Sequence, residues 1–138
     1  MHSTEIDIRA YHCDGYGHVN NARYLELLDE ARWRAWEAID YGWFAERQMQ
    51  VVVSRIDIRY LREAVIGDRL TIETELLALN VRDGVFRQCI VRAGKRVAEA
   101  EVTFAVLGPA SRRALVIEDE LKARLLGLGL RTDESTET

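Results

Sequence analysis

The stretch YHCDGYGHVNNARYLELLDEAR, residues 11–32, holds the residues whose types and spacing best suit catalysis. Asp14 stands beside two glycines, and Asn20 and Asn21 follow it just before a helical pattern. Asn caps helix N-termini, where backbone amides without intrahelical partners concentrate roughly half a positive charge. A carboxylate beside such amides could hydrolyse an activated acyl bond while the amides bind the developing oxyanion.

The first turn of the predicted helix contains Arg23 and no carboxylate. A helix optimised only for stability usually carries Asp or Glu there, so these amides would be left for an external oxygen. The same residues also fit a plain turn and a routine helix cap, since Asp-Gly is common in turns. Spacing alone therefore leaves both interpretations open.

Periodic patterns around this stretch predict the elements that position it. Residues 4–10 alternate as a half-buried strand does, and apolar residues at helical spacing predict one long amphipathic helix over 22–39. Gly42 is the expected terminator of that helix. Four further strands are predicted over 49–62, 69–80, 84–93 and 95–107, and then a short helix over 118–126. Residues 1–131 are thus expected to form a single domain, followed by a polar, frayed tail over 132–138.

This order of elements predicts an α+β fold in which a five-stranded antiparallel sheet wraps around one long helix. One helix cannot cover both faces of such a sheet, and the sheet has edges to protect. We therefore expect at least a homodimer, in which the two sheets join edge to edge.

Composition excludes several classes of protein. The 138 residues are 48% apolar and 30% charged, which is typical of a folded domain and not of a disordered or fibrous chain. A net charge of −4 argues against a general nucleic-acid binder. The sequence shows neither a signal peptide nor an apolar run long enough for a membrane span. Two distant cysteines, Cys13 and Cys89, favour a reducing, cytoplasmic setting.

A metal site is not expected, although His12, Cys13, Asp14 and His18 lie close together in the sequence. Neighbouring residues of a strand point to opposite faces, which would separate His12 from Cys13. The spacing also fits no standard zinc pattern. Both cysteines are most simply small core residues.

The 11–32 stretch resembles the signature of hotdog-fold acyl-CoA thioesterases of the 4-hydroxybenzoyl-CoA thioesterase superfamily. In that signature an aspartate precedes a Gly-containing turn, His-Val-Asn-Asn, an aromatic-rich helix start and Glu-x-Ala-Arg. The chain supplies Asp14, Gly17, His18-Val19-Asn20-Asn21, Tyr24-Leu25 and Glu30-Ala31-Arg32. The likeness covers roughly residues 6–121 and is greatest to the thioesterase III (FadM-type) branch, which acts on long-chain acyl-CoA.

The resemblance implies a hotdog fold, with dimers often paired into tetramers and active sites at the dimer interface. It makes Asp14 the catalytic carboxylate and the backbone amide near Asn21 the oxyanion donor. Two departures stand out. His12 occupies a position where some relatives have a second acid, and residues 61–64, Leu-Arg-Glu-Ala, lack one basic residue and a Pro that relatives often have. The second departure bears on the loop that binds CoA.

Together these observations predict an acyl-CoA thioesterase, with medium- or long-chain fatty acyl-CoA as the expected substrate. Asp14 acts as nucleophile or general base, His18 orients the substrate or a water, and amides near Asn20 and Asn21 form the oxyanion hole. CoA is part of the substrate, so no separate cofactor is expected. Candidate acyl-chain walls, which also fit ordinary core, are Tyr24, Leu28, Val52, Val53 and Phe104. Candidate phosphate ligands, which also fit ordinary surface charge, are Arg59 and Arg62.

Two alternatives share this fold. A hotdog dehydratase or hydratase would use a His with an acidic partner, and His18 with Asp14 could serve, although the order with Asp first argues against it. A non-catalytic acyl-CoA-binding dimer would release no thiol from its ligand.

Overall fold

The computed structural model describes residues 1–110 and 112–129, so the expected tail over 132–138 lies outside the described residues. Its elements follow the predicted order, with two short additions near the long helix. They are β1 (His2–Asp7), the 3₁₀ turn η1 (Ala10–His12), α1 (Asn21–Ala38), α2 (Tyr41–Glu46), β2 (Gln50–Tyr60), β3 (Arg69–Leu79), β4 (Gly84–Arg92), β5 (Lys95–Leu107) and α3 (Asp119–Leu126).

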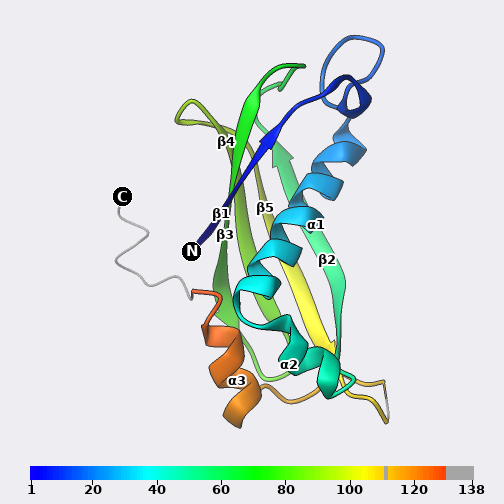
Figure 1. Cartoon of the computed structure of the whole chain (residues 1–138), viewed down its shortest axis with the longest axis vertical. Helices are drawn as coiled ribbons and strands as arrows, with labels where there is room; N and C mark the ends of the chain where they lie inside the picture. Colours follow the sequence, from blue (N-terminus) through cyan, green and yellow to red (C-terminus); the bar gives the residue numbers. More distant parts are fainter. Residues whose placement is uncertain (111, 130–138) are drawn as a thin grey trace.

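The five strands form one sheet in the order β1-β3-β4-β5-β2, and every neighbouring pair is antiparallel. α1 lies along one face of this sheet, and α3 lies at the end away from the start of α1 (Figure 1). This confirms the predicted α+β architecture, a five-stranded antiparallel sheet around one long helix with a short C-terminal helix.

The apolar stripe of α1 accounts for its position. Its buried residues recur at helical spacing, while the carboxylates of Glu26, Glu30 and Glu37 lie on the exposed side. Trp36 meets the rings of Phe44, Phe86 and Phe104 edge to face, with centroids 5.5–5.6 Å apart. Aromatic packing of this kind fixes one end of α1 against β4 and β5.

A buried polar group joins the middle of α1 to the sheet. The Arg32 guanidinium donates to the side-chain oxygen of Gln88 at 2.9 Å. The amide nitrogen of Gln88 donates to the Leu28 carbonyl at 3.0 Å and to the Thr74 hydroxyl at 3.1 Å. Burying a polar group without a hydrogen-bond partner costs free energy, so these bonds favour one position of α1 on the sheet.

The end of β1 and the residue that follows the end of α1 differ from expectation. β1 ends at Asp7, three residues early, because the Arg9 backbone N–H turns to donate to His12 Nδ1 at 2.8 Å and opens η1. Gly42 lies inside α2 and does not terminate α1. Asp40 joins α1 to α2, and its φ of 62° supplies the left-handed conformation expected of the glycine.

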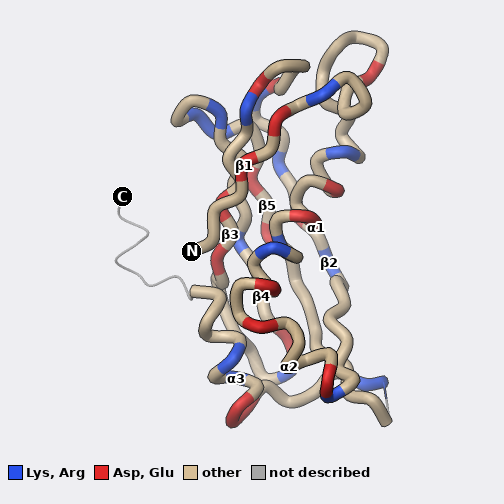
Figure 2. The backbone as a smooth tube through the Cα atoms, in the orientation of Figure 1, with Lys and Arg blue, Asp and Glu red and all other residues tan. Residues whose placement is uncertain are grey.

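β2 is an edge strand of the described sheet and pairs with β5, and its register shifts between Val53 and Arg55. Paired residues share a face of the sheet, so Val53 lies on the face of Phe104, its buried partner. Val52 pairs with Ala105 and lies on the opposite face. Acidic and basic residues are interspersed along the described chain, with no single-sign stripe (Figure 2).

Candidate active site

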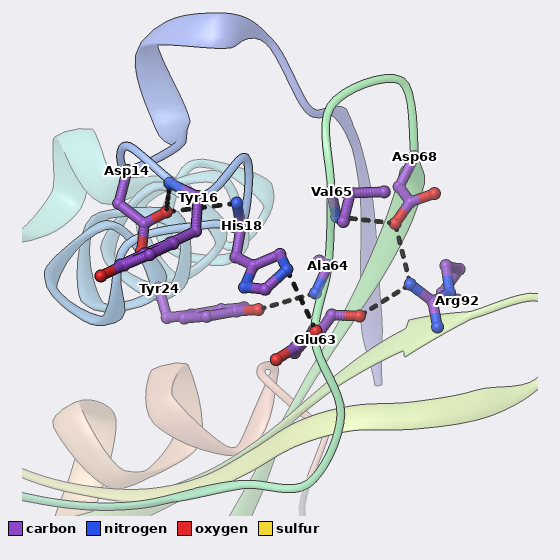
Figure 3. Close-up of polar contacts among 9 residues, drawn as sticks. All are labelled: Asp14, Tyr16, His18, Tyr24, Glu63, Ala64, Val65, Asp68 and Arg92. Atoms are coloured by element: carbon purple, nitrogen blue, oxygen red, sulfur yellow. Dashed lines mark hydrogen bonds and ion pairs between the residues drawn. The ribbon is translucent and has the colours of Figure 1, made fainter.

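Asp14 opens the predicted tight turn, and its own backbone closes it. The Asp14 carbonyl accepts from Gly17 N at 3.1 Å, and its N–H donates to the His18 carbonyl at 2.8 Å. Gly17 has φ +82°, a conformation that favours glycine. The carboxylate oxygen Oδ1 accepts from the Tyr16 and His18 amides at 2.8 and 3.3 Å (Figure 3). The turn thus fixes Oδ1, and Oδ2 has no hydrogen-bond partner among the described residues.

The start of α1 resolves which of the two asparagines caps the helix. Asn20 is the N-cap, and its side-chain oxygen accepts from the Ala22 amide at 2.9 Å. Asn21 is the first helical residue, a position whose N–H has no intrahelical partner. Within the described part of the chain, no other group accepts from it. The first turn contains no acidic residue, as predicted.

A second loop, residues 61–68, packs against this turn through backbone contacts. The Ala64 carbonyl accepts from the Val19 amide at 2.9 Å, and the Ala64 amide donates to the Tyr24 hydroxyl at 3.2 Å. A β-bridge also pairs His18 with Val65. Burial raises the pKa of the Tyr24 phenol, so the hydroxyl stays protonated while its oxygen accepts this bond.

The far end of the 61–68 loop is fixed by an ion pair. Asp68 Oδ2 accepts from the Val65 amide at 2.9 Å and from the Arg92 guanidinium at 2.8 Å. The Val65 amide, and then Arg92, hold the pKa of the Asp68 carboxyl below its usual range. Arg92 also donates to the Glu63 carbonyl at 2.7 Å (Figure 3). Both ends of the loop are therefore anchored to the sheet and to α1.

A pocket of ≈ 260 Å³ opens between the turn, the start of α1 and this loop. Five of the predicted site residues line it, and Tyr60 and Glu63 are added to them. Tyr60 donates its hydroxyl to the Asn21 carbonyl at 3.2 Å, and Glu63 Oε2 lies 3.2 Å from His18 Nε2. The lining residues are Asp14, His18, Val19, Asn21, Tyr24, Tyr60, Leu61, Arg62 and Glu63.

The remaining candidates lie elsewhere. Leu28 is fully buried in the core, and the Asn20 side chain is occupied as the helix cap. Val52 and Arg59 lie on the other face of the sheet, because side chains alternate along β2. There Arg59 lines a charged groove with Asp57, Arg87, Glu99 and Glu101.

Val53 and Phe104 line a second, smaller cavity of ≈ 40 Å³ between α1 and β2. It lies beside Arg32, Trp33 and Trp36, so it follows α1 away from Asp14. Eleven residues separate Asn21 from Arg32, which corresponds to about 16 Å along a helix at 1.5 Å per residue.

Sequence analysis missed Tyr60 and Glu63 as site residues, because only the strand order brings the end of β2 to the start of α1. The one signal was the departure at residues 61–64. In the described chain, no three His, Cys, Asp or Glu side chains gather as a metal would require. Nor does any helix there combine the length and the apolar character needed to cross a membrane.

Comparison with known proteins gives a consistent family assignment. Residues 8–125 match the model of the thioesterase-like superfamily. The chain is 43% identical over 125 residues to the long-chain acyl-CoA thioesterase FadM of Escherichia coli (strain K12), covering 88% of this chain and 95% of that protein. It is 26% identical over 121 residues to the acyl-CoA thioesterase YbgC of Haemophilus influenzae, covering 84% and 89%.

Solved structures show the same fold. The probable thioesterase YbaW of Escherichia coli superposes with a TM-score of 0.85 at 39% identity, covering 93% of this chain and 98% of that one. A thioesterase from Thermus thermophilus, solved with coenzyme A and Zn, superposes with a TM-score of 0.79 at 24% identity, covering 94% and 95%. The hotdog fold implied by the sequence resemblance is therefore confirmed.

Proposed function

The chain belongs to the thioesterase-like superfamily, and from this premise we propose that it hydrolyses acyl-CoA thioesters to a free acid and CoA. One observation carries the proposal. Asp14 Oδ2 and the Asn21 N–H, neither of which has a hydrogen-bond partner among the described residues, belong to residues that line the same pocket. A carboxylate and an oxyanion donor are the two groups that acyl transfer from a thioester requires.

In the proposed reaction, the thioester carbonyl oxygen accepts a hydrogen bond from Asn21 N–H at the positive end of α1. Asp14 Oδ2 then follows one of two routes. It attacks the carbonyl carbon, expelling the CoA thiolate and leaving a mixed anhydride that water hydrolyses, or it removes a proton from the attacking water. The chemistry uses only groups of the chain, since CoA is part of the substrate.

Replacing Asp14 tests this proposal. We expect Asp14→Asn to lower kcat at least ~10²-fold, the lower end of an acid–base contribution, as measured by release of free CoA with a thiol reagent. Asp83→Asn changes a half-buried loop aspartate bonded to Asn80; it is the matched control and should keep wild-type turnover. Near-native turnover by Asp14→Asn would remove Asp14 from the mechanism.

The same assay distinguishes the alternatives. A dehydratase or hydratase would hydrate enoyl-CoA and release no thiol, whereas a binding dimer would retain acyl-CoA unchanged. Single-turnover hydrolysis in ¹⁸O-water separates the two routes for Asp14. Label in the protein carboxylate indicates that Asp14 attacked the thioester and that water then opened the anhydride at the Asp14 carbonyl.

For the substrate, we propose a medium- or long-chain acyl group that runs along α1 from Asp14 toward the cavity beside Val53 and Phe104. The largely apolar lining of that cavity, which Asp29 and Arg32 border, and its distance along the helix support this placement. Arg62, at the pocket, is then the better placed of the two arginines for a CoA phosphate, since Arg59 lies on the other face. Rates over a series of acyl-CoA lengths test the assignment.

We further propose that the protein works as a homodimer in the cytoplasm. β2 is an edge strand, and Val52, Val53, Ile56 and Tyr60 on it are between 37% and 43% exposed. An apolar edge of this kind is protected when a second copy pairs with it. The thiols of Cys13 and Cys89 are free, which agrees with a reducing compartment.

A further inference from the structure

Glu63 lies in the stretch 61–64, which departs from the pattern that the sequence resemblance implies, and its carboxylate faces a site residue. Its Oε2 lies 3.2 Å from His18 Nε2, in the wall of the pocket that contains Asp14. We propose that Glu63 is a positioning residue that fixes the orientation and the tautomer of the His18 imidazole. This inference rests on the proposed thioester hydrolysis.

The backbone around Glu63 is held on both sides, so the carboxylate starts from a fixed point. Arg92 donates to the Glu63 carbonyl at 2.7 Å, and the Ala64 amide donates to Tyr24. The bridge between His18 and Val65 ties the loop to the turn that carries the imidazole. The loop backbone that carries Glu63 and the turn that carries His18 are thus held together, and the two side chains face each other (Figure 3).

Stability does not explain the pair. The His18 and Glu63 side chains are 39% and 70% exposed, and exposed pairs of this kind contribute only about 0–1 kcal/mol. The loop keeps its place through Asp68, Arg92 and Ala64 without the Glu63 carboxylate. The pair is better explained by what it does to the imidazole.

A carboxylate is only an acceptor, so a neutral His18 must carry its proton on Nε2 to bond with Glu63. Nδ1 is then the unprotonated ring nitrogen and can accept a hydrogen bond from a water in the pocket. The backbone N–H of His18 meanwhile holds Asp14 Oδ1 at 3.3 Å. His18 therefore contacts Asp14 through its backbone N–H and can orient a water through its imidazole, and Glu63 fixes the orientation of that imidazole.

The kinetic test compares Glu63→Ala with wild type in the CoA-release assay. We expect kcat to fall roughly tenfold, the lower end for partners that orient a histidine ligand, and KM to change less than about twofold, because no binding contact is removed. Glu120→Gln is the matched control. It weakens an exposed ion pair with Arg124 in α3, far from the pocket, and should keep wild-type kinetics.

A double-mutant cycle asks whether Glu63 acts through His18. In a His18→Gln background, we expect Glu63→Ala to cause no further loss of kcat. An equal loss in both backgrounds would overturn the inference, and so would a wild-type kcat for Glu63→Ala.

Nitrogen NMR of the imidazoles at pH 8 reads the tautomer directly. We expect His18 to be protonated on Nε2 in the wild type and mixed between Nε2 and Nδ1 in Glu63→Ala, with His18→Gln assigning the signal. His12 is an internal reference, since Arg9 N–H already donates to its Nδ1. A His18 signal that is unchanged in Glu63→Ala would overturn the inference about Glu63. The proposed function would still stand, as long as the wild type turns over acyl-CoA. Absence of thioesterase turnover in the wild type would instead overturn the proposed function.

Discussion

The side chain and the backbone N–H of Asn21 can be changed separately. Proline at the first position of a helix removes only an N–H that has no intrahelical partner, and its fixed φ suits the helix. The preceding residue, Asn20, already has the extended conformation that proline demands, with φ −64° and ψ 138°. Asn21→Pro is therefore a backbone mutation that the fold should accept.

We expect Asn21→Pro to lower kcat by ~10²–10³-fold, the loss seen when a single oxyanion donor is removed. Asn21→Ala keeps the N–H and should keep kcat within a few-fold of wild type. Steady-state kinetics and a thermal unfolding scan of both variants check this expectation. Equal turnover by the two variants would show that the oxyanion is bound elsewhere.

Residue types near one another in the sequence were enough to predict half of the pocket. Asp14, His18 and Asn21 lie within eight residues, so a turn and a helix start bring them together. Tyr60 and Glu63 join them only through the sheet, because both lie 39 or more residues along the chain from Asn21. A local pattern contains no information about such a contact.

Among the elements, the 61–68 loop depends on one carboxylate. The pKa of Asp68 is lowered in the folded protein, first by the Val65 amide and then by Arg92. Its stabilising effect is therefore complete above the unfolded pKa of about 3.8 and is lost as the pH falls below that value toward the folded pKa.

We expect Asp68→Asn to lower the free energy of unfolding by about 1 kcal/mol at pH 7, as one charge-assisted hydrogen bond is weakened. As the pH falls below about 3.8, the difference from wild type should shrink, because the unfolded wild-type carboxyl then takes up a proton that the folded carboxylate, with its lowered pKa, resists. Urea unfolding at pH 7, 4 and 3 measures both quantities. A constant difference over this range would contradict the assigned role of the carboxylate.

The seating of α1 depends on Gln88, which bonds to Arg32, Leu28 and Thr74 in the core. We expect Gln88→Leu to lower the free energy of unfolding by about 1–3 kcal/mol, since it leaves buried polar groups without a partner. Gln50→Leu, at the exposed start of β2, is the control and should change it by less than about 0.5 kcal/mol. Urea unfolding at pH 7 gives both values.

Strong periodicity made the long elements predictable, whereas the short helical elements α2 and η1 had no periodic signal. The amphipathic stripe of α1 and the alternation of β2 to β5 each span nine or more residues. α2 is six residues long and η1 three, fewer than two helical turns each. The left-handed residue after α1 could not be predicted either, because Asp40, and not a glycine, adopts that conformation.

For the whole molecule, association through β2 is the property that a single substitution should change. Lysine on an edge strand is a device that blocks strand pairing. We expect Ile56→Lys, in the middle of β2, to convert the proposed dimer to a monomer, so that the measured mass falls from that of two chains to that of one. Light scattering after size exclusion measures it, with Lys122→Ile in α3 as a control that leaves the mass unchanged. A dimeric Ile56→Lys protein would place the interface elsewhere.

Besides the ion pair between Glu63 and His18, main-chain bonds at Val19, Ala64 and Val65 join the 61–68 loop to the turn of the site. Main-chain bonds of this kind do not depend on most side chains. Leu61 and Ile66 can therefore be replaced without a change in the backbone geometry of the loop. A small randomised library at these two positions should consist largely of folded variants. Selectivity between thioesters could thus diverge among descendants of this chain without any change in its scaffold.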